Sequence, residues 1–169
     1  VRACAVKEGA LTSPTTTKTY FVTNEENIPR YNLPVLALTI QENKLFGYQN
    51  GIYTPGIDYE TFRDQYPEEL PIDEGAGNYF RRGEENEQSG NLEIYNGTNE
   101  LIFEDEVEVR IHGGITRMFP QKSLRIYAGT GDGFDGSLFF PFFRDLNDRV
   151  EGNKIDLFRR IILRTPQSA

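Results

Sequence analysis

The chain has 169 residues, with 26 Asp and Glu against 18 Lys and Arg, a formal net charge of −8 and a pI near 4.8. This acidic balance argues against a nucleic-acid partner, because a phosphate backbone attracts a basic surface. The length suffices for one domain with a proper core or slightly more, and no apolar run is long enough to span a membrane.

The first residues predict a small hairpin. The run from Val1 to Gly9 places Val1, Ala3 and Ala5 in one phase against Arg2, Cys4 and Val6 and turns at Glu8-Gly9. TTTKTYFV (15–22) is rich in β-branched and aromatic residues, which suits a strand. The chain begins with Val1, so we expect a piece of a longer protein, with any export signal outside it. The polar stretch 24–32 is interpreted as a linker.

The only cysteine, Cys4, rules out an internal disulfide bond. With His112 as the only histidine, a Cys/His zinc site is implausible, and Cys4 is interpreted as structural rather than nucleophilic. The carboxylates between Asp58 and Glu74 lack a recognised metal-ligand spacing. No metal site is therefore predicted.

The next segments predict strands separated by short helices. LPVLALTI (Leu33–Ile40) is almost uninterruptedly apolar, as a buried strand is, and short helices are expected within 41–48 and near 59–65. Between them, GIYTPG (51–56) is interpreted as a strand edge that ends at Pro55. Arg81, Arg82 and Glu84 form either an exposed ion-pair cluster or a group that contacts phosphate or Lys122.

Alternating residues from 91 to 128 predict the centre of the sheet. Strands are expected at Asn91–Tyr95, Glu100–His112 and Lys122–Ala128, and Asn96-Gly97 favours a type I′ hairpin turn. Asn96-Gly97-Thr98 is also a glycosylation sequon, although the turn alone explains it. Lys122 shares the phase of Leu124 and Ile126. An unpaired buried ammonium is costly, so Lys122 either needs an anionic partner or reaches solvent along its methylene stem.

The last part of the chain predicts a turn, an aromatic segment and a final strand. GTGDGFDGS (129–137) is interpreted as a flexible turn, because it lacks a phosphate-loop motif and carries two aspartates. LFFPFFRD (138–145) is expected to supply an aromatic plug for the core, and Phe158–Arg164 to form a strand. Together these segments predict an α+β fold that is mostly β and antiparallel, with one or two short helices.

The string RIHGGITRMFPQKSLRIYA (Arg110–Ala128) closely resembles the signature segment of the CotH family, which is named for a spore-coat protein kinase. Similar pieces occur in the expected order: LPVLALTI, GIYTPG, NYFRRGEENE, FFPFF and FRRIILRT. The resemblance implies an incomplete N-terminal lobe of an atypical kinase over 33–169, with the C-terminal lobe absent. Residues 1–23 resemble the last strands of the immunoglobulin-like module found at the C-terminus of chitobiases.

CotH family members are regarded as secreted or surface-located kinases that transfer phosphate from ATP to protein serines. The resemblance therefore implies ATP and Mg²⁺ as cofactors, a protein substrate, and an extracellular or cell-surface location. It implies that Lys122 contacts the nucleotide, while Arg117 and Gln121 flank it and add phosphate or backbone contacts. The metal-binding and catalytic acidic residues are expected in the C-terminal lobe, so the fragment itself is expected to be inactive. The alternative is a non-catalytic, β-rich surface module that binds protein or glycan.

Overall fold

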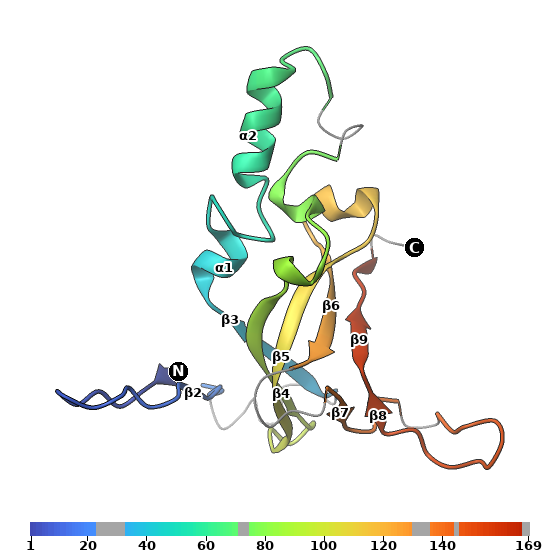
Figure 1. The fold of residues 1–169 in the computed structure, drawn as a ribbon. Helices are drawn as coiled ribbons and strands as arrows, with labels where there is room; N and C mark the ends of the chain where they lie inside the picture. Colours follow the sequence, from blue (N-terminus) through green and yellow to red (C-terminus); the bar gives the residue numbers. More distant parts are fainter. Residues whose placement is uncertain (23–32, 71–74, 130–135, 144–145, 167–169) are drawn as a thin grey trace. The chain divides into compact units, whose positions relative to one another are not determined.

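A computed structural model describes residues 1–22, 33–70, 75–129, 136–143 and 146–166. Its main feature is a five-stranded sheet in the order β3-β4-β5-β6-β9 (Figure 1). The strands are β3 (Val35–Ile40), β4 (Gln88–Tyr95), β5 (Leu101–His112), β6 (Ser123–Ala128) and β9 (Arg160–Leu163). The mostly β, antiparallel α+β fold predicted from the sequence is confirmed. Its relation to a kinase lobe stays a prediction.

Short strands and helices precede, separate and follow the strands of this sheet in the sequence. Two small antiparallel pairs are formed by β1 (Arg2–Ala3) with β2 (Thr16–Thr17), and by β7 (Leu138–Phe139) with β8 (Leu157–Phe158). The helices are α1 (Glu42–Phe46), α2 (Gly56–Gln65) and the 3₁₀ turns η2 (Asn78–Phe80), η3 (Glu84–Asn86) and η4 (Ile115–Met118). None of the helices in the described ranges is long and apolar enough to cross a membrane.

The alternation of β5, β6 and β9 separates their side chains onto two faces. Both strand pairs are antiparallel, with Val109 opposite Ile126 and Ile126 opposite Ile161, and all three side chains are buried. On the other face Arg110 lies opposite Arg125, and Tyr127 lies opposite Arg160. One face is therefore core and the other is polar and rich in arginine.

The chain divides into two compact units, each described by itself. One unit comprises Val1–Thr39 with Asn91–Asp105, and the other comprises Ile40–Gly90 with Glu106–Ala169. The predicted boundaries at residues 23 and 33 stay predictions, because the linker at 24–32 lies outside the described residues.

Within the first unit, a buried carboxylate holds the N-terminal hairpin against β4. Glu93 is fully buried and accepts hydrogen bonds from the Thr19 hydroxyl and from the Tyr95 hydroxyl, the latter at 2.8 Å. Phe21 packs edge-to-face on Tyr95, with ring centroids 4.9 Å apart. Burial alone would raise the pKa of Glu93, but the bonds from Thr19 and Tyr95 lower it. The contacts of Thr19 and Phe21 thus hold the end of the N-terminal segment within this unit, whereas residues 1–16 are exposed.

Within the second unit, a small apolar cluster forms beside η2 and η4. Ile52, Tyr79 and Ile111 are buried in it, and partly buried neighbours pack against them. Those neighbours are Leu45, Tyr53, Phe80, Met118 and Leu124. The cluster joins residues far apart in the sequence and forms the surroundings of the predicted lysine.

Two predictions of local structure were wrong, one for GIYTPG and one for the type of turn between β4 and β5. GIYTPG is not a strand edge: Ile52 and Tyr53 form a turn, and Pro55 has helical angles (φ −60°, ψ −44°) that lead directly into α2. The hairpin between β4 and β5 exists, but its left-handed residue is Asn99 (φ 63°) rather than Gly97. The Asn96 side chain caps this turn by accepting from the backbone of Thr98 and Glu100 at 2.9 Å.

The predicted aromatic plug is present only in part. Phe139 is 70% exposed and Phe143 is 53% exposed, while buried Leu138 supplies the core contact. Phe142 and Phe143 instead pack edge-to-face on Phe158, with centroids 5.5 and 5.7 Å away. Pro141 interrupts strand pairing here, so the phenylalanine rings of this segment pack against Phe158. Most of the predicted flexible turn, 130–135, lies outside the described residues.

Candidate functional site

Lys122 lies immediately before β6 and is only 7% exposed. Its ammonium donates to the Phe119 carbonyl at 2.7 Å and lies over the rings of Tyr79 and Tyr53, with Nζ 4.4 and 5.1 Å from their centroids. The Lys122 backbone N–H donates to the Tyr53 hydroxyl at 2.9 Å, which fixes the start of the strand. The lysine thus occupies the end of an apolar row, in phase with Ile126.

The surroundings of this ammonium are neutral. Within the described ranges, no carboxylate forms a salt bridge with Lys122. Burial lowers the pKa of Lys122 from 10.5 to about 8. Aromatic faces and one carbonyl compensate part of the lost hydration, because the ring quadrupole attracts a cation. The side chain therefore does not reach solvent along its stem, which was the simpler alternative for a lysine at a strand end.

Arg117, predicted to flank the nucleotide, is a second buried cation at 6% exposure. Its Nε donates to the Gly113 carbonyl at 2.8 Å, and its Nη1 donates to the carbonyls of Tyr79 and Arg81 at 3.1 and 2.9 Å. Burial and nearby arginines lower the pKa of Arg117 to about 10. Of the two contacts considered from the sequence, phosphate or backbone, the structure contains the backbone contacts.

The structure brings two of the three predicted residues together. Arg117 holds the Tyr79 carbonyl, and Lys122 lies over the Tyr79 ring, so both cations depend on the same residue. Gln121 is exposed beside them. Tyr53 and Tyr79 were missed by the sequence reasoning, and the only local signal that could have indicated packing is the apolar residue beside each, Ile52 and Phe80.

The cluster at 81–84 does not pair with Lys122. Arg81 instead makes two hydrogen bonds to the Asp58 carboxylate of α2, at 2.7 and 2.8 Å, and donates to the Gln49 carbonyl at 2.9 Å. Such a bidentate pair fixes the orientation of both side chains. Arg81 is thus held by α2 and by the backbone at Gln49.

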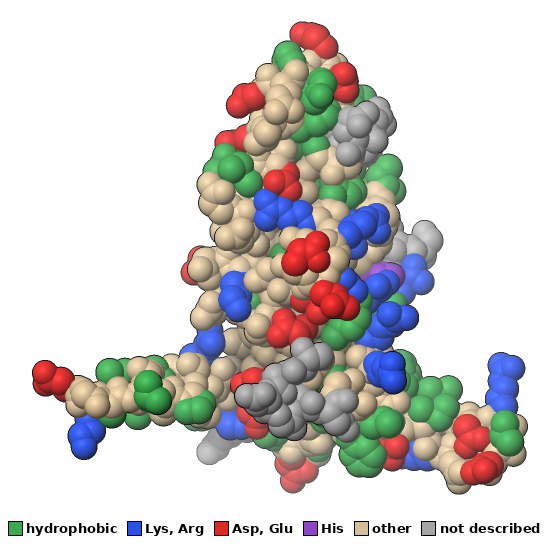
Figure 2. Space-filling model, in the orientation of Figure 1, with side chains coloured by type: hydrophobic (Ala, Val, Ile, Leu, Met, Phe, Trp, Pro, Cys, Tyr) green, Lys and Arg blue, Asp and Glu red, His purple; other side chains and the backbone are tan. Residues whose placement is uncertain are grey.

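A polar network that the sequence reasoning did not single out covers the opposite face of β5 and β6. The Tyr127 hydroxyl accepts from Arg110 Nε at 3.0 Å and from Arg125 Nη1 at 3.2 Å. Arg125 Nη2 contacts His112 Nδ1 at 2.8 Å, and Glu87 lies 3.3 Å from Arg110 Nε. Figure 2 shows the histidine surrounded by blue Lys and Arg side chains. The phase of Arg110, Arg125 and Tyr127, opposite to the core residues, was the signal that could have identified this network.

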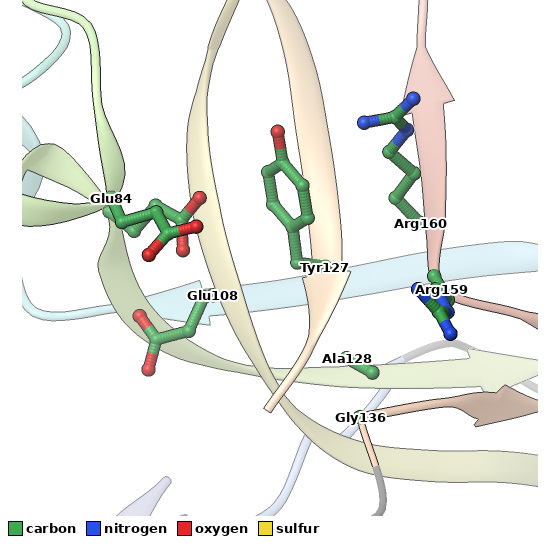
Figure 3. Close-up of a pocket in the computed structure, with 8 residues that line it drawn as sticks. Glu84, Glu108, Tyr127, Ala128, Gly136, Arg159 and Arg160 are labelled. Carbon is green, nitrogen blue, oxygen red and sulfur yellow. The ribbon is translucent and has the colours of Figure 1, made fainter. Parts of the chain in front are cut away.

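This network borders a pocket of about 830 Å³. Figure 3 shows Tyr127 on β6 between two carboxylates, Glu84 and Glu108, and two arginines, Arg160 on β9 and Arg159 just before it. Burial raises the pKa of Glu87, which also lines the pocket, despite the nearby Arg110 charge. The pocket therefore has carboxylates on one side and guanidinium groups on the other.

Metal ligands do not gather in the part of the chain that the structure describes: no three His, Cys, Asp or Glu side chains are placed to hold an ion. Comparisons with protein-family models, with curated proteins and with solved structures gave no match. The fold and the site geometry are thus the basis for any functional conclusion, together with the sequence resemblance.

Proposed function

We propose that this chain is the N-terminal portion of a CotH-like protein kinase, secreted or at the cell surface. In the parent protein it would help to transfer phosphate from ATP to protein serines, with Mg²⁺ as the metal. The resemblance of Arg110–Ala128 motivates the proposal, and the burial of Lys122 is the structural observation that supports it best.

A buried lysine with a lowered pKa is unusual unless the position serves a function. Its desolvation is an energetic cost that a methionine of similar length would avoid, and perturbed ionisable groups concentrate at functional sites. The ammonium is held by Phe119 and by two tyrosine rings. In the proposed role, Lys122 exchanges the Phe119 carbonyl for a phosphate oxygen, which is a stronger, charge-assisted acceptor.

Arg117 and Gln121 have supporting parts in this proposal. Arg117 holds the backbone that presents Tyr79, so it positions the ring beneath the lysine. Gln121 is exposed next to Lys122, and its amide is proposed to contact the nucleotide in the parent protein. The carboxylates that bind Mg²⁺ and activate the serine are proposed to belong to the C-terminal lobe.

The test is binding of ATP–Mg²⁺ to the 169-residue chain, measured by isothermal titration calorimetry. Lys122→Met keeps the apolar stem and removes the charge, so we expect binding to weaken at least tenfold. Lys154→Met is the matched control, because Lys154 is exposed. Equal affinity in wild type and Lys122→Met would refute the nucleotide role of the lysine.

A parent protein with both lobes allows the catalytic test. Lys122→Met should lower phosphate transfer by orders of magnitude, and Lys122→Arg should also fail because a planar guanidinium does not replace a compact ammonium. The 169-residue chain alone should transfer no labelled phosphate. Transfer by this chain that disappears in Lys122→Ala would show that the catalytic residues lie within it.

A non-catalytic binding module is the second candidate, and the exposed rings near β7 and β8 favour it. Phe139 and Phe143 are 70% and 53% exposed, and exposed aromatic faces stack on sugars or on protein side chains. This function predicts no affinity for ATP–Mg²⁺. It also predicts that Phe139→Ser, which removes an exposed ring, abolishes binding to a glycan or protein partner without lowering stability.

A further inference from the structure

Two arginines lie directly opposite each other on the polar face of the sheet. Arg110 on β5 is the register partner of Arg125 on β6, and both are half-buried. Like charges directly opposite in adjacent strands are destabilising. Glu87 compensates Arg110 at 3.3 Å, whereas no described carboxylate forms a salt bridge with Arg125.

The partners of Arg125 among the described residues are neutral. It donates to the Tyr127 hydroxyl and contacts His112 Nδ1, and its buried Nε has no hydrogen-bond partner in the described ranges of the chain. Burial lowers the pKa of His112, and the charge of Arg125 lowers it further, so the ring is neutral and its Nδ1 accepts. A half-buried guanidinium without a counter-charge is expensive, and native proteins retain such groups where an anion is bound.

Tyr127 places a polarised donor at the centre of this cationic group. Its oxygen accepts from both Arg110 and Arg125, while its own O–H donates to no acceptor among the described residues. Burial alone would raise the pKa of the phenol, but the bonds from Arg110 and Arg125 lower it. A hydroxyl that accepts from two cations is a better donor, because hydrogen bonds in a chain polarise one another.

Arg160 adds a cation at the open end of the group. It is the register partner of Tyr127 on β9, it is exposed, and no described carboxylate forms a salt bridge with it. In Figure 3 the Tyr127 hydroxyl and the Arg160 guanidinium extend toward the same end of the pocket. Both residues line the pocket, so a ligand there meets donors from two adjacent strands.

We propose that Tyr127, Arg110, Arg125 and Arg160 form a binding site for a single phosphate group. The site consists of N–H and O–H donors, and arginine matches the oxygens of phosphate in a bidentate manner. The carboxylates of Glu84 and Glu108 line the same pocket and repel additional negative charge. The ligand is therefore a phosphomonoester or free phosphate rather than a polyphosphate chain.

This site is separate from the proposed nucleotide site. Lys122 shares the phase of the core residue Ile126, whereas Arg125 and Tyr127 lie in the opposite phase, so one phosphate cannot contact both. The inference goes beyond the proposed kinase function and does not depend on it.

The test is a titration of the ¹⁵N-labelled 169-residue chain with inorganic phosphate, followed by NMR, with ionic strength held constant by chloride. We expect saturable shifts of the Tyr127 amide and of the arginine Nε–H signals. Arg160→Gln and Tyr127→Phe should each weaken phosphate binding about tenfold, since each removes a donor aimed at the ligand. Both changes leave the core face intact.

The control is Arg149→Gln, which removes an exposed arginine outside the pocket. Equal weakening in this control, or unchanged affinity in both Arg160→Gln and Tyr127→Phe, would overturn the site. Phosphate binding that survives Lys122→Met but not Arg160→Gln would support it, whatever the outcome for ATP. Displacement of phosphate by O-phosphoserine or by AMP then distinguishes a phosphorylated side chain from a nucleotide as the natural source.

Discussion

Replacing Lys122 by methionine should make the folded chain more stable at neutral pH. The unfolded chain keeps the lysine proton up to a pKa near 10.5, whereas the folded chain loses it near 8. A difference of about 2.5 pKa units corresponds to roughly 3 kcal/mol that the charged form costs the folded state. Methionine has a similar stem and no charge, but it loses the bond to Phe119 and the attraction of Tyr79. We therefore expect a net gain of about 1–3 kcal/mol at pH 7.

The sign of the pH dependence makes this expectation specific. Between pH 8 and 10.5 the unfolded wild type binds more protons than the folded wild type, so wild-type stability rises with pH through this window. The Lys122→Met variant lacks this contribution. Its advantage should therefore shrink as the pH rises, while tyrosines and other groups titrate alike in both proteins.

Urea unfolding at pH 7 and at pH 10, for wild type and variant, measures both quantities. Lys154→Met, in which the lysine is exposed, should change stability little at either pH. The reasoning would be refuted if Lys122→Met were less stable than wild type at pH 7, or if the difference between them did not depend on pH. Either result would mean that the aromatic rings and the carbonyl fully compensate the desolvation of the ammonium.

Three further changes test other parts of the structure by urea unfolding. Glu93→Gln should lower the free energy of unfolding by about 1–3 kcal/mol, because it weakens the hydrogen bonds that the buried Glu93 carboxylate accepts. Since the pKa of Glu93 is lowered in the folded chain, the wild type should also lose stability as the pH falls through that pKa, and the variant should not. Asp58→Asn should cost less, about 1 kcal/mol, because the Asp58 side chain is 39% exposed and its pair with Arg81 is screened by water. Gly56→Ala should cost about 2 kcal/mol or more, because Gly56 has φ +56° and an added Cβ would lie 2.1 Å from the Asn78 amide. Equal costs for Glu93→Gln and Asp58→Asn, or a neutral Gly56→Ala, would contradict these assignments.

The strands of the sheet were predictable because their residues alternate with period two. The alternation in Val107–His112 and Lys122–Ala128 separates core from polar positions without any knowledge of the neighbours. The ends were less predictable: β4 begins at Gln88 rather than at Asn91, since polar residues join a ladder through their backbone. Local sequence thus predicts which face of the sheet a side chain occupies better than it predicts where a strand begins and ends.

Turns and aromatic segments were predicted less well, for a physical reason. In the β4–β5 turn the Asn96 side chain caps three backbone and side-chain donors, and this capping overrides the usual Asn-Gly geometry. In the Phe139–Phe143 segment, the rings of Phe142 and Phe143 pack against Phe158 instead of entering the main core. Composition indicated that these residues would cluster, but it did not indicate where.

Of the residues around the candidate site, the sequence singled out Lys122 but not the tyrosines that contact it. The phase of Lys122 left two alternatives open, burial with an anionic partner or a path to solvent along the stem, and the structure shows burial among neutral groups. Its tyrosine neighbours come from residues 53 and 79, and such long-range contacts leave no local pattern in a sequence. The Arg110–Arg125 opposition was likewise invisible until the register of two strands was known.

Strand β9 ends the sheet within the described part of the chain, and its sequence bears on the solubility of the protein. Ile161, Ile162 and Leu163 form an apolar β-prone run, and such a run at a sheet edge is a template for intermolecular pairing. Arg159 and Arg160 precede this run and Arg164 follows it. Charges on both sides of a strand act as gatekeepers, because stacking identical strands would bring like charges together. Arg159, Arg160 and Arg164 thus disfavour pairing of this edge with further copies of the same strand.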